Sequence, residues 1–190
     1  MKIILVRHAK VLLPHKQLLY ASEMPAGVEA YDQAPIETAV PNRDALVCLA
    51  ESVAVRVCSG LSRSRRSLAL LGYNPDIRDS LFDEVAIPKV TWRGIKLPPP
   101  VWLVSFRIAS LFGYRGGGES LGDIKRRATY AVDRLLSLDT QAQSVMLLGH
   151  GLFNRFIAKE LKKRHWRETK ALGSANWSYG IFEIDSSKER

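Results

Sequence analysis

Three short, mainly apolar runs in this sequence each lead into side chains that could do chemistry. They are Ile3–Val6 before Arg7 and His8, Ala54–Cys58 before Ser59 and Arg63, and Ser144–Leu148 before His150. Short apolar runs of this kind are typical of strands buried in a sheet. If the three strands run parallel, the loops that follow them lie at one edge of the sheet. We therefore expect two histidines and at least two arginines to share a pocket.

These side chains predict phosphoryl transfer. Guanidinium groups neutralise and orient a phosphoryl group, and a neutral imidazole is a competent nucleophile toward phosphorus. A metal site needs three or four ligands at suitable spacing, and two histidines among arginines fit that requirement poorly. We expect no metal and no cofactor.

The rest of the chain alternates between predicted strands and helices that would position these loops. Helices are expected over residues 42–50, 62–72, 120–136 and 153–163, with a last strand over residues 179–184. Ser62 and Ser120 are the expected N-caps of two of these helices. Residues 10–40 show no clean period, so we expect a long irregular crossing with one short helix.

Residues 88–118 differ from this alternating pattern. They contain Pro98–Pro100, an apolar stretch from Val101 to Phe112, and Gly116–Gly118. We interpret them as a lid or side subdomain inserted into a single domain of residues 1–190. Polar residues interrupt the apolar stretch, and its length suits a core helix or a dimer contact rather than a transmembrane span.

The charge balance favours an anionic partner without identifying it. The chain has 190 residues, with 28 Lys and Arg against 19 Asp and Glu, for a formal net charge of +9. A phosphate ester, a nucleic acid or an anionic lipid would satisfy this charge equally well. The basic run at residues 159–170 matches no nucleic-acid-binding motif and is interpreted as a solvated face, so we do not expect a nucleic-acid partner.

The two cysteines, Cys48 and Cys58, favour a reducing compartment. Both lie in apolar surroundings without CxxC spacing, so we expect buried free thiols rather than a disulfide or a metal site. The first apolar run is too short for the hydrophobic region of a signal peptide. Together these observations predict a cytoplasmic protein with no transmembrane segment.

Four segments resemble motifs of the histidine phosphatase superfamily, which has the phosphoglycerate-mutase-like fold. Leu5–Ala9 is similar to the RHG or RHA motif, and Ser59–Ser67 to the segment S-x-L-x-R-A-x-x-T. Gly118–Ser120 resembles the GES helix start, and Gly149–Gly151 the second histidine motif. Each motif alone arises often by chance, but the four stand in the family's order. The resemblance and the alternation of elements imply a three-layer α/β/α sandwich with a mostly parallel central sheet flanked by helices.

The resemblance also implies a role for each matching residue. His8 corresponds to the family's nucleophile, which forms a phosphohistidine that water later hydrolyses. Arg7, Arg63 and His150 correspond to residues that hold the phosphate, and His150 also donates to the transferring group.

A proton donor for the leaving group is expected from the segment Phe82–Val85, which looks like the family's L-x-E or F-R-E motif. The match points to Glu84, with Asp83, one position away, as a competitor. A carboxyl group that donates a proton near neutral pH needs a raised pKa.

The residues after His8 depart from the family's pattern. Ala9 replaces a glycine and is a known variation, but Lys10–Leu12 replaces the usual acidic or amide residue and the polar residues that follow it. No asparagine stands where many members have one after the first motif. We therefore expect an intact nucleophile and an altered wall facing the substrate.

The activity implied by the resemblance is that of a metal-independent phosphatase of the histidine acid type, a phosphoric monoester hydrolase with a small phosphorylated substrate. A phosphoglycerate-mutase-like phosphotransferase is one alternative, because basic residues of the lid could hold a substrate while it reorients. These residues are Arg93, Lys96, Arg107 and Arg115. The altered residues after His8 favour another alternative, a non-catalytic module that binds a phosphorylated ligand. The apolar lid would also allow a homodimer.

Overall fold

The sheet at the centre of the protein joins the three strands that the sequence predicts. The computed structural model describes residues 1–12, 18–88, 90–91, 93–111, 116–138 and 144–184. Its six strands are β1 (Lys2–Arg7), β2 (Val55–Ser59), β3 (Ile77–Asp79), β4 (Ser144–Gly149), β5 (Trp166–Lys170) and β6 (Tyr179–Ile184). They lie in the order β3-β2-β4-β1-β6-β5. The first four strands of this order are parallel, whereas β6 is antiparallel to β1 and β5. The prediction of a mostly parallel sheet is confirmed.

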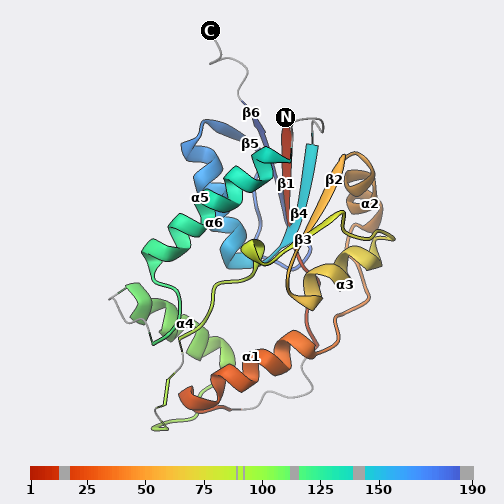
Figure 1. Ribbon diagram of the computed structural model, residues 1–190. Helices are drawn as coiled ribbons and strands as arrows, with labels where there is room; N and C mark the ends of the chain where they lie inside the picture. Colours follow the sequence, from red (N-terminus) through yellow and green to blue (C-terminus); the bar gives the residue numbers. More distant parts are fainter. Residues whose placement is uncertain (13–17, 89, 92, 112–115, 139–143, 185–190) are drawn as a thin grey trace.

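Side chains of the central strands alternate between two cores, so helices cover both faces of the sheet. The covering helices are α2 (Arg43–Glu51), α3 (Ser62–Leu70), α5 (Leu121–Ser137) and α6 (Gly151–Lys163). Ile3 and Leu5 pack in one core with residues of α5 and α6. Ile4 and Val6 pack in the other core with residues of α2 and α3. Figure 1 shows the two helix pairs on opposite sides of the sheet, which confirms the three-layer arrangement.

Two further helices, α1 (Met24–Gln33) and α4 (Pro99–Leu111), lie beyond the edge where the parallel strands end (Figure 1). A small core joins them, in which Met24 packs with Trp102 and Phe106. The two aromatic rings are stacked, with their centroids 5.5 Å apart. Helix α4 is the apolar part of the segment that the sequence sets apart. Within the described ranges, no helix is long and apolar enough to cross a membrane.

The structure corrects several local predictions. Cys58 is buried as expected, but Cys48 is exposed on α2, and both thiols are free. Leu61 rather than Ser62 is the N-cap of α3, and Ser62 is the first helical residue, whose hydroxyl donates to the carbonyl oxygen of Asp32 at 2.7 Å and accepts from Arg66 at 2.9 Å. Ser120 does cap α5 as predicted.

Two strands have no counterpart in the sequence predictions. β3 has three residues, none of them fully buried, which is too short for a hydrophobic period. β5 lies within the basic run, where only Trp166 is buried. Ion pairs join Lys162 to Glu168 and Arg164 to Asp133 beside this edge strand.

Candidate active site

A cavity of about 550 Å³ lies at the edge of the sheet where β1 and β2 end. Of the residues that the sequence singles out, Arg7, His8, Arg63, Asp83 and Glu84 line it. His150 is fully buried and outside this lining, and its ring packs beside that of His8 with the centroids 5.2 Å apart. The structure therefore places five of the predicted residues around one cavity and the sixth, His150, beside His8.

The end of β1 presents His8 in a fixed orientation. The backbone N–H of His8 donates to Gly149 at 3.1 Å, and the Asn176 side chain donates to the carbonyl of His8 at 2.9 Å. Nδ1 of His8 lies 2.6 Å from the carbonyl oxygen of Ala9. Because a carbonyl only accepts, Nδ1 carries the proton and Nε2 the lone pair. The hydroxyl of Ser67 on α3 accepts from the N–H of Ala9 at 2.8 Å and fixes this turn.

The surroundings of His8 keep its imidazole neutral. Burial lowers the pKa of His8 to about 3, and the charges of Arg63 and Arg7 act in the same direction, against the hydrogen bond with Ala9. A histidine with so low a pKa is uncharged at neutral pH. The neutral form, with one nitrogen unprotonated, is the form that acts as a nucleophile.

Arg63, in the first turn of α3, is held by two residues of α1. Its Nη1 donates to the carboxylate of Asp32, and its guanidinium lies 5.2 Å from the centroid of the Tyr31 ring. The side chain is almost fully buried, yet its Nε has no hydrogen-bond partner among the described residues. Asp32 thus fixes one edge of the guanidinium while the Nε–H stays unused.

Arg7 packs against the first residue of α6. Its Nη1 donates to the carbonyl of Ser174, and its Nε is buried with no partner in the described part of the chain. A Cβ atom at Gly151 would lie only 3.0 Å from this Nε, so glycine makes room for the guanidinium. Buried N–H groups without partners are rare. The Nε–H groups of Arg7 and Arg63 are thus two buried donors whose acceptor is not among the described residues.

His150 joins the end of β4 to the start of α6. Its Nε2 lies 2.7 Å from Oγ of Ser59, and this oxygen accepts from the N–H of Leu61 at 3.2 Å. Nδ1 of His150 is buried without a partner in the described ranges. Burial lowers the pKa of His150 well below its usual value, and the charge of Arg63 and the neighbouring His8 add to this effect. Both imidazoles of the site are thus neutral.

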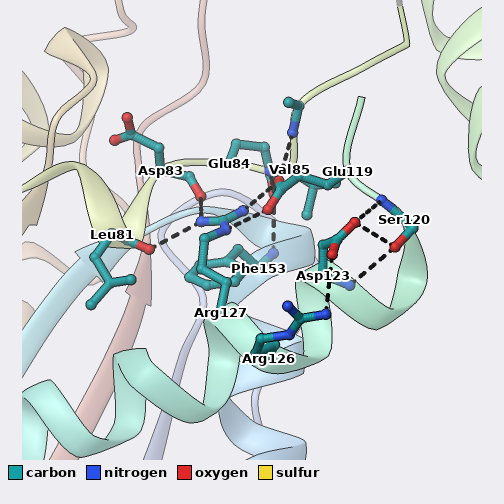
Figure 2. Close-up of polar contacts among 11 residues, drawn as sticks. Leu81, Asp83, Glu84, Val85, Glu119, Ser120, Asp123, Arg126, Arg127 and Phe153 are labelled. Carbon is teal, nitrogen blue, oxygen red and sulfur yellow. Dashed lines mark hydrogen bonds and ion pairs between the residues drawn. The ribbon is translucent and has the colours of Figure 1, made fainter. Parts of the chain in front are cut away.

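Glu84 and Asp83 are adjacent in sequence, but their carboxyl groups lie in different surroundings. Oε1 of Glu84 accepts from the N–H of Phe153 at 3.0 Å, and Oε2 accepts from that of Leu152 at 3.3 Å. Glu84 therefore sits at the N-terminus of α6, where the helix dipole favours a negative group. Burial raises the pKa of Asp83, and backbone hydrogen bonds and the charge of Arg127 oppose the rise. Figure 2 shows the two side chains leaving the chain in different directions.

Arg127 of α5 holds the segment that carries both carboxyl groups (Figure 2). Its Nη1 donates to the carbonyl oxygens of Leu81 at 3.0 Å and Asp83 at 2.8 Å. Its Nε and Nη2 bind the two carboxylate oxygens of Glu119 at 2.6 and 2.8 Å. Glu119 in turn accepts from the N–H of Ala86 at 3.1 Å. The Arg127–Glu119 pair thus ties the segment to α5 on both sides of Glu84.

Sequence reasoning missed the residues that hold the site in place. They are Tyr31, Asp32, Arg127, Ser174 and Asn176. All but Arg127 lie in irregular or weakly patterned stretches. Arg127 follows Glu119 of the GES motif by two helical turns, and that spacing was the one available signal. Within the described ranges, no group of three or more His, Cys, Asp or Glu side chains is placed to hold a metal ion.

Comparisons with known proteins point to the same superfamily that the sequence motifs resemble. The model of the histidine phosphatase superfamily (branch 1) matches residues 45–190. No curated protein matches the sequence of the chain.

Solved structures share the fold at low sequence identity. A putative α-ribazole-5′-P phosphatase from Escherichia coli K-12 is 14% identical, with a TM-score of 0.60 over 98% of this chain and 92% of that one. A mycobacterial glucosyl-3-phosphoglycerate phosphatase is 19% identical, with a TM-score of 0.54 over 95% and 88% of the two chains. A mutant phosphoserine phosphatase from Entamoeba histolytica, in complex with phosphoserine, is 15% identical, with a TM-score of 0.56 over 97% and 91%.

Proposed function

This chain belongs to the histidine phosphatase superfamily, and on that premise we propose that it is a phosphatase that hydrolyses a small phosphomonoester through a phosphohistidine on His8. The observation that carries the proposal is the state of His8. Its imidazole is neutral, its Nδ1 proton is engaged by Ala9, and two buried guanidinium groups beside it have unused N–H donors.

In the first step, Nε2 of His8 attacks phosphorus, and the ester P–O bond breaks. Arg7 and Arg63 neutralise the non-bridging oxygens of the phosphoryl group, and His150 donates a hydrogen bond from Nδ1. Glu84 gives its proton to the leaving alkoxide. In the second step, the resulting carboxylate takes a proton from water, the water oxygen attacks phosphorus, and the N–P bond breaks to release inorganic phosphate and neutral His8.

The proton donor is proposed as Glu84, with Asp83 as the alternative. Glu84 is supported by its match to the family motif and by its direct place on the cavity wall, whereas its hydrogen bonds at the N-terminus of α6 favour the carboxylate over the acid. Asp83 is supported by the raised pKa of its carboxyl group. Both residues line the cavity.

We further propose that residues 1–190 form a single domain in which residues 88–118 act as a lid, and that the protein is cytoplasmic. A homodimer is proposed through the outer face of α4. Val101, Val104 and Ile108 lie three and four residues apart on this helix, and each is close to half exposed. The oligomeric state in solution tests this contact.

The activity is tested by release of inorganic phosphate from a panel of phosphomonoesters, with and without EDTA. The proposed chemistry uses only protein side chains, so hydrolysis is expected and EDTA should leave its rate unchanged. Binding of phosphate without hydrolysis of any ester, across the acidic and neutral pH range, would favour the non-catalytic module instead.

A further inference from the structure

Beyond the groups that would hold the phosphate, most of the side chains that line the cavity are apolar. They include Val28 of α1, Ile87, Leu103 and Phe106 of α4, Ile124 of α5 and Phe156 of α6. The alcohol half of a substrate would therefore leave water for a hydrocarbon surface. Apolar groups gain from such a transfer, whereas charged groups lose their hydration.

The arginines that line the described part of the cavity leave no cation for a second anionic group. Arg7 and Arg63 are committed to the phosphate by the proposed mechanism. Arg127 is engaged by both oxygens of Glu119 and by two backbone carbonyls. The acidic side chains of Asp32 and Glu119 also line this space, each paired with an arginine. A carboxylate or second phosphate on the alcohol would thus meet hydrocarbon and paired charges, with no free cation among the described lining residues.

The basic residues of the segment 88–118 do not change this balance where the structure describes them. Arg93 and Lys96 are exposed and lie outside the cavity lining. The ammonium group of Lys96 lies 4.8 Å from the centroid of the Tyr20 ring. Arg115 and the side chain of Arg107 lie outside the described part of the chain.

We propose that this site selects phosphate monoesters of small apolar or aromatic alcohols and rejects alcohols that carry a second anionic group. The proposal rests on the phosphatase activity proposed above and names its substrate class. A volume of about 550 Å³ lies within the range of pockets for small ligands, which favours a soluble ester over a membrane lipid. The same preference speaks against a mutase, whose phosphoglycerate substrate carries a carboxylate.

A comparison of kcat/KM for α-naphthyl phosphate, phosphoserine and phosphoglycerate tests the proposal on the unaltered protein. The aromatic ester should exceed both anionic esters by about 100-fold or more, since a few apolar contacts and one unpaired charge are each worth one to two orders of magnitude. Equal or reversed values, with clear hydrolysis, would overturn the selectivity and leave the phosphatase standing. Hydrolysis of none of the three would overturn the phosphatase itself, and the inference with it.

A matched pair of variants on α4 locates the selectivity in the cavity. Leu103 lines the cavity, whereas its neighbour Val104 is 52% exposed on the outer face. Leu103→Arg should lower the ratio of kcat/KM for α-naphthyl phosphate over phosphoglycerate by about 10-fold, because it supplies the missing cation. Val104→Arg adds the same charge on the outer face, in the proposed dimer contact but outside the cavity, and should leave the ratio between the two substrates unchanged. An equal fall in both variants would contradict the proposal.

Phosphatidate in phosphatidylcholine vesicles separates a soluble ester from a membrane lipid. Its two acyl chains exceed the cavity, so its kcat/KM should be about 100-fold below that of α-naphthyl phosphate. Comparable values would overturn the assignment to a small soluble ester.

Discussion

The imidazole rings of His8 and His150 pack against each other at 59°, with their centroids 5.2 Å apart. The sheet produces this contact, because Arg7 on β1 pairs with Gly149 on the adjacent parallel strand β4. The residue that follows each strand therefore emerges beside the other. Burial and the charges of the neighbouring arginines disfavour a proton on either imidazole, so both rings stay neutral.

This pairing predicts that the protein loses stability in acid. Burial lowers the pKa of His8 to about 3 and that of His150 well below its usual value. A histidine in the unfolded chain has a pKa of about 6.5. Below that pH the two histidines are therefore protonated in the unfolded state but stay neutral in the folded state. The free energy of unfolding should fall as the pH drops from about 6.5 toward 3, and these two groups should cause no change above that window.

Urea denaturation of two variants over this pH range checks the contribution of His8. His8→Asn removes one of the two titrating groups and should give a shallower decline. His165→Asn, at an exposed histidine far from the site, should decline like the unaltered protein. Identical slopes for the two variants would contradict the buried neutral state of His8.

A second prediction concerns the close approach of Gly151 to Arg7. In Gly151→Ala the new methyl group would lie about 3.0 Å from Nε of Arg7 and push the guanidinium aside. We expect kcat/KM to fall about 10-fold, as for a misplaced positioning group. Gly122→Ala is the matched control, since the nearest atom to its Cβ is 3.7 Å away. It should leave activity unchanged, and an equal loss of activity in both variants would refute the account.

The third prediction separates the two candidate proton donors. Glu84→Gln should slow hydrolysis of phenyl phosphate by about 100-fold, in the range for a lost general acid. It should slow p-nitrophenyl phosphate much less, because the nitrophenolate leaves without help. Asp83→Asn should affect both esters alike. If Asp83→Asn instead shows the selective loss, the proton donor is Asp83 and our assignment of Glu84 is wrong.

The fourth prediction treats Arg127 as a positioning residue for this carboxyl group. A lysine cannot reach two backbone carbonyls and both oxygens of Glu119 at once. Arg127→Lys should therefore raise the sensitivity of the rate to the leaving group, as Glu84→Gln does, and lower kcat for phenyl phosphate by about 10-fold. In the double variant Arg127→Lys, Glu119→Gln, the loss of activity, expressed as a free energy, should be smaller than the sum of the losses in the two single variants.

Arg126→Lys provides the control for this experiment. Its guanidinium is 67% exposed and pairs with Asp123 at 3.4 Å, away from the segment that carries Glu84 (Figure 2). It should leave the leaving-group dependence unchanged. If Arg127 had a purely structural role, Arg127→Lys would lower the stability of the protein but leave the leaving-group dependence of the rate unchanged, as in Arg126→Lys.

The parts of the fold that the sequence predicts are those with strong local signals. Strands β1 and β4 are continuous apolar runs buried on both faces, and α5 has both an N-cap at Ser120 and a helical period. Strand β5 has one buried residue and charged neighbours, because it lies at the edge of the sheet. Its partner β6 supplies the hydrogen bonds that make it a strand, and no local pattern encodes a partner.

The residues of the candidate site likewise differ in whether a local sequence signal predicts their place. Residues directly after strands, such as His8 and His150, are placed by the parallel register, which can be inferred from the runs themselves. Asp32 reaches Arg63 from a helix in a stretch without a clear period, and Asn176 reaches His8 from a loop near the other end of the chain. Such contacts depend on the packing of distant segments, so the sequence alone does not predict them.

The central claim, a phosphoryl group carried on His8, is tested most directly by trapping the intermediate. The protein is mixed with radiolabelled p-nitrophenyl phosphate, quenched in alkali and separated from substrate under denaturing conditions. The account predicts labelled protein that loses its label in acid, the same label in His165→Asn, and none in His8→Ala. Label that persists in His8→Ala, or rapid hydrolysis by that variant, would contradict the account.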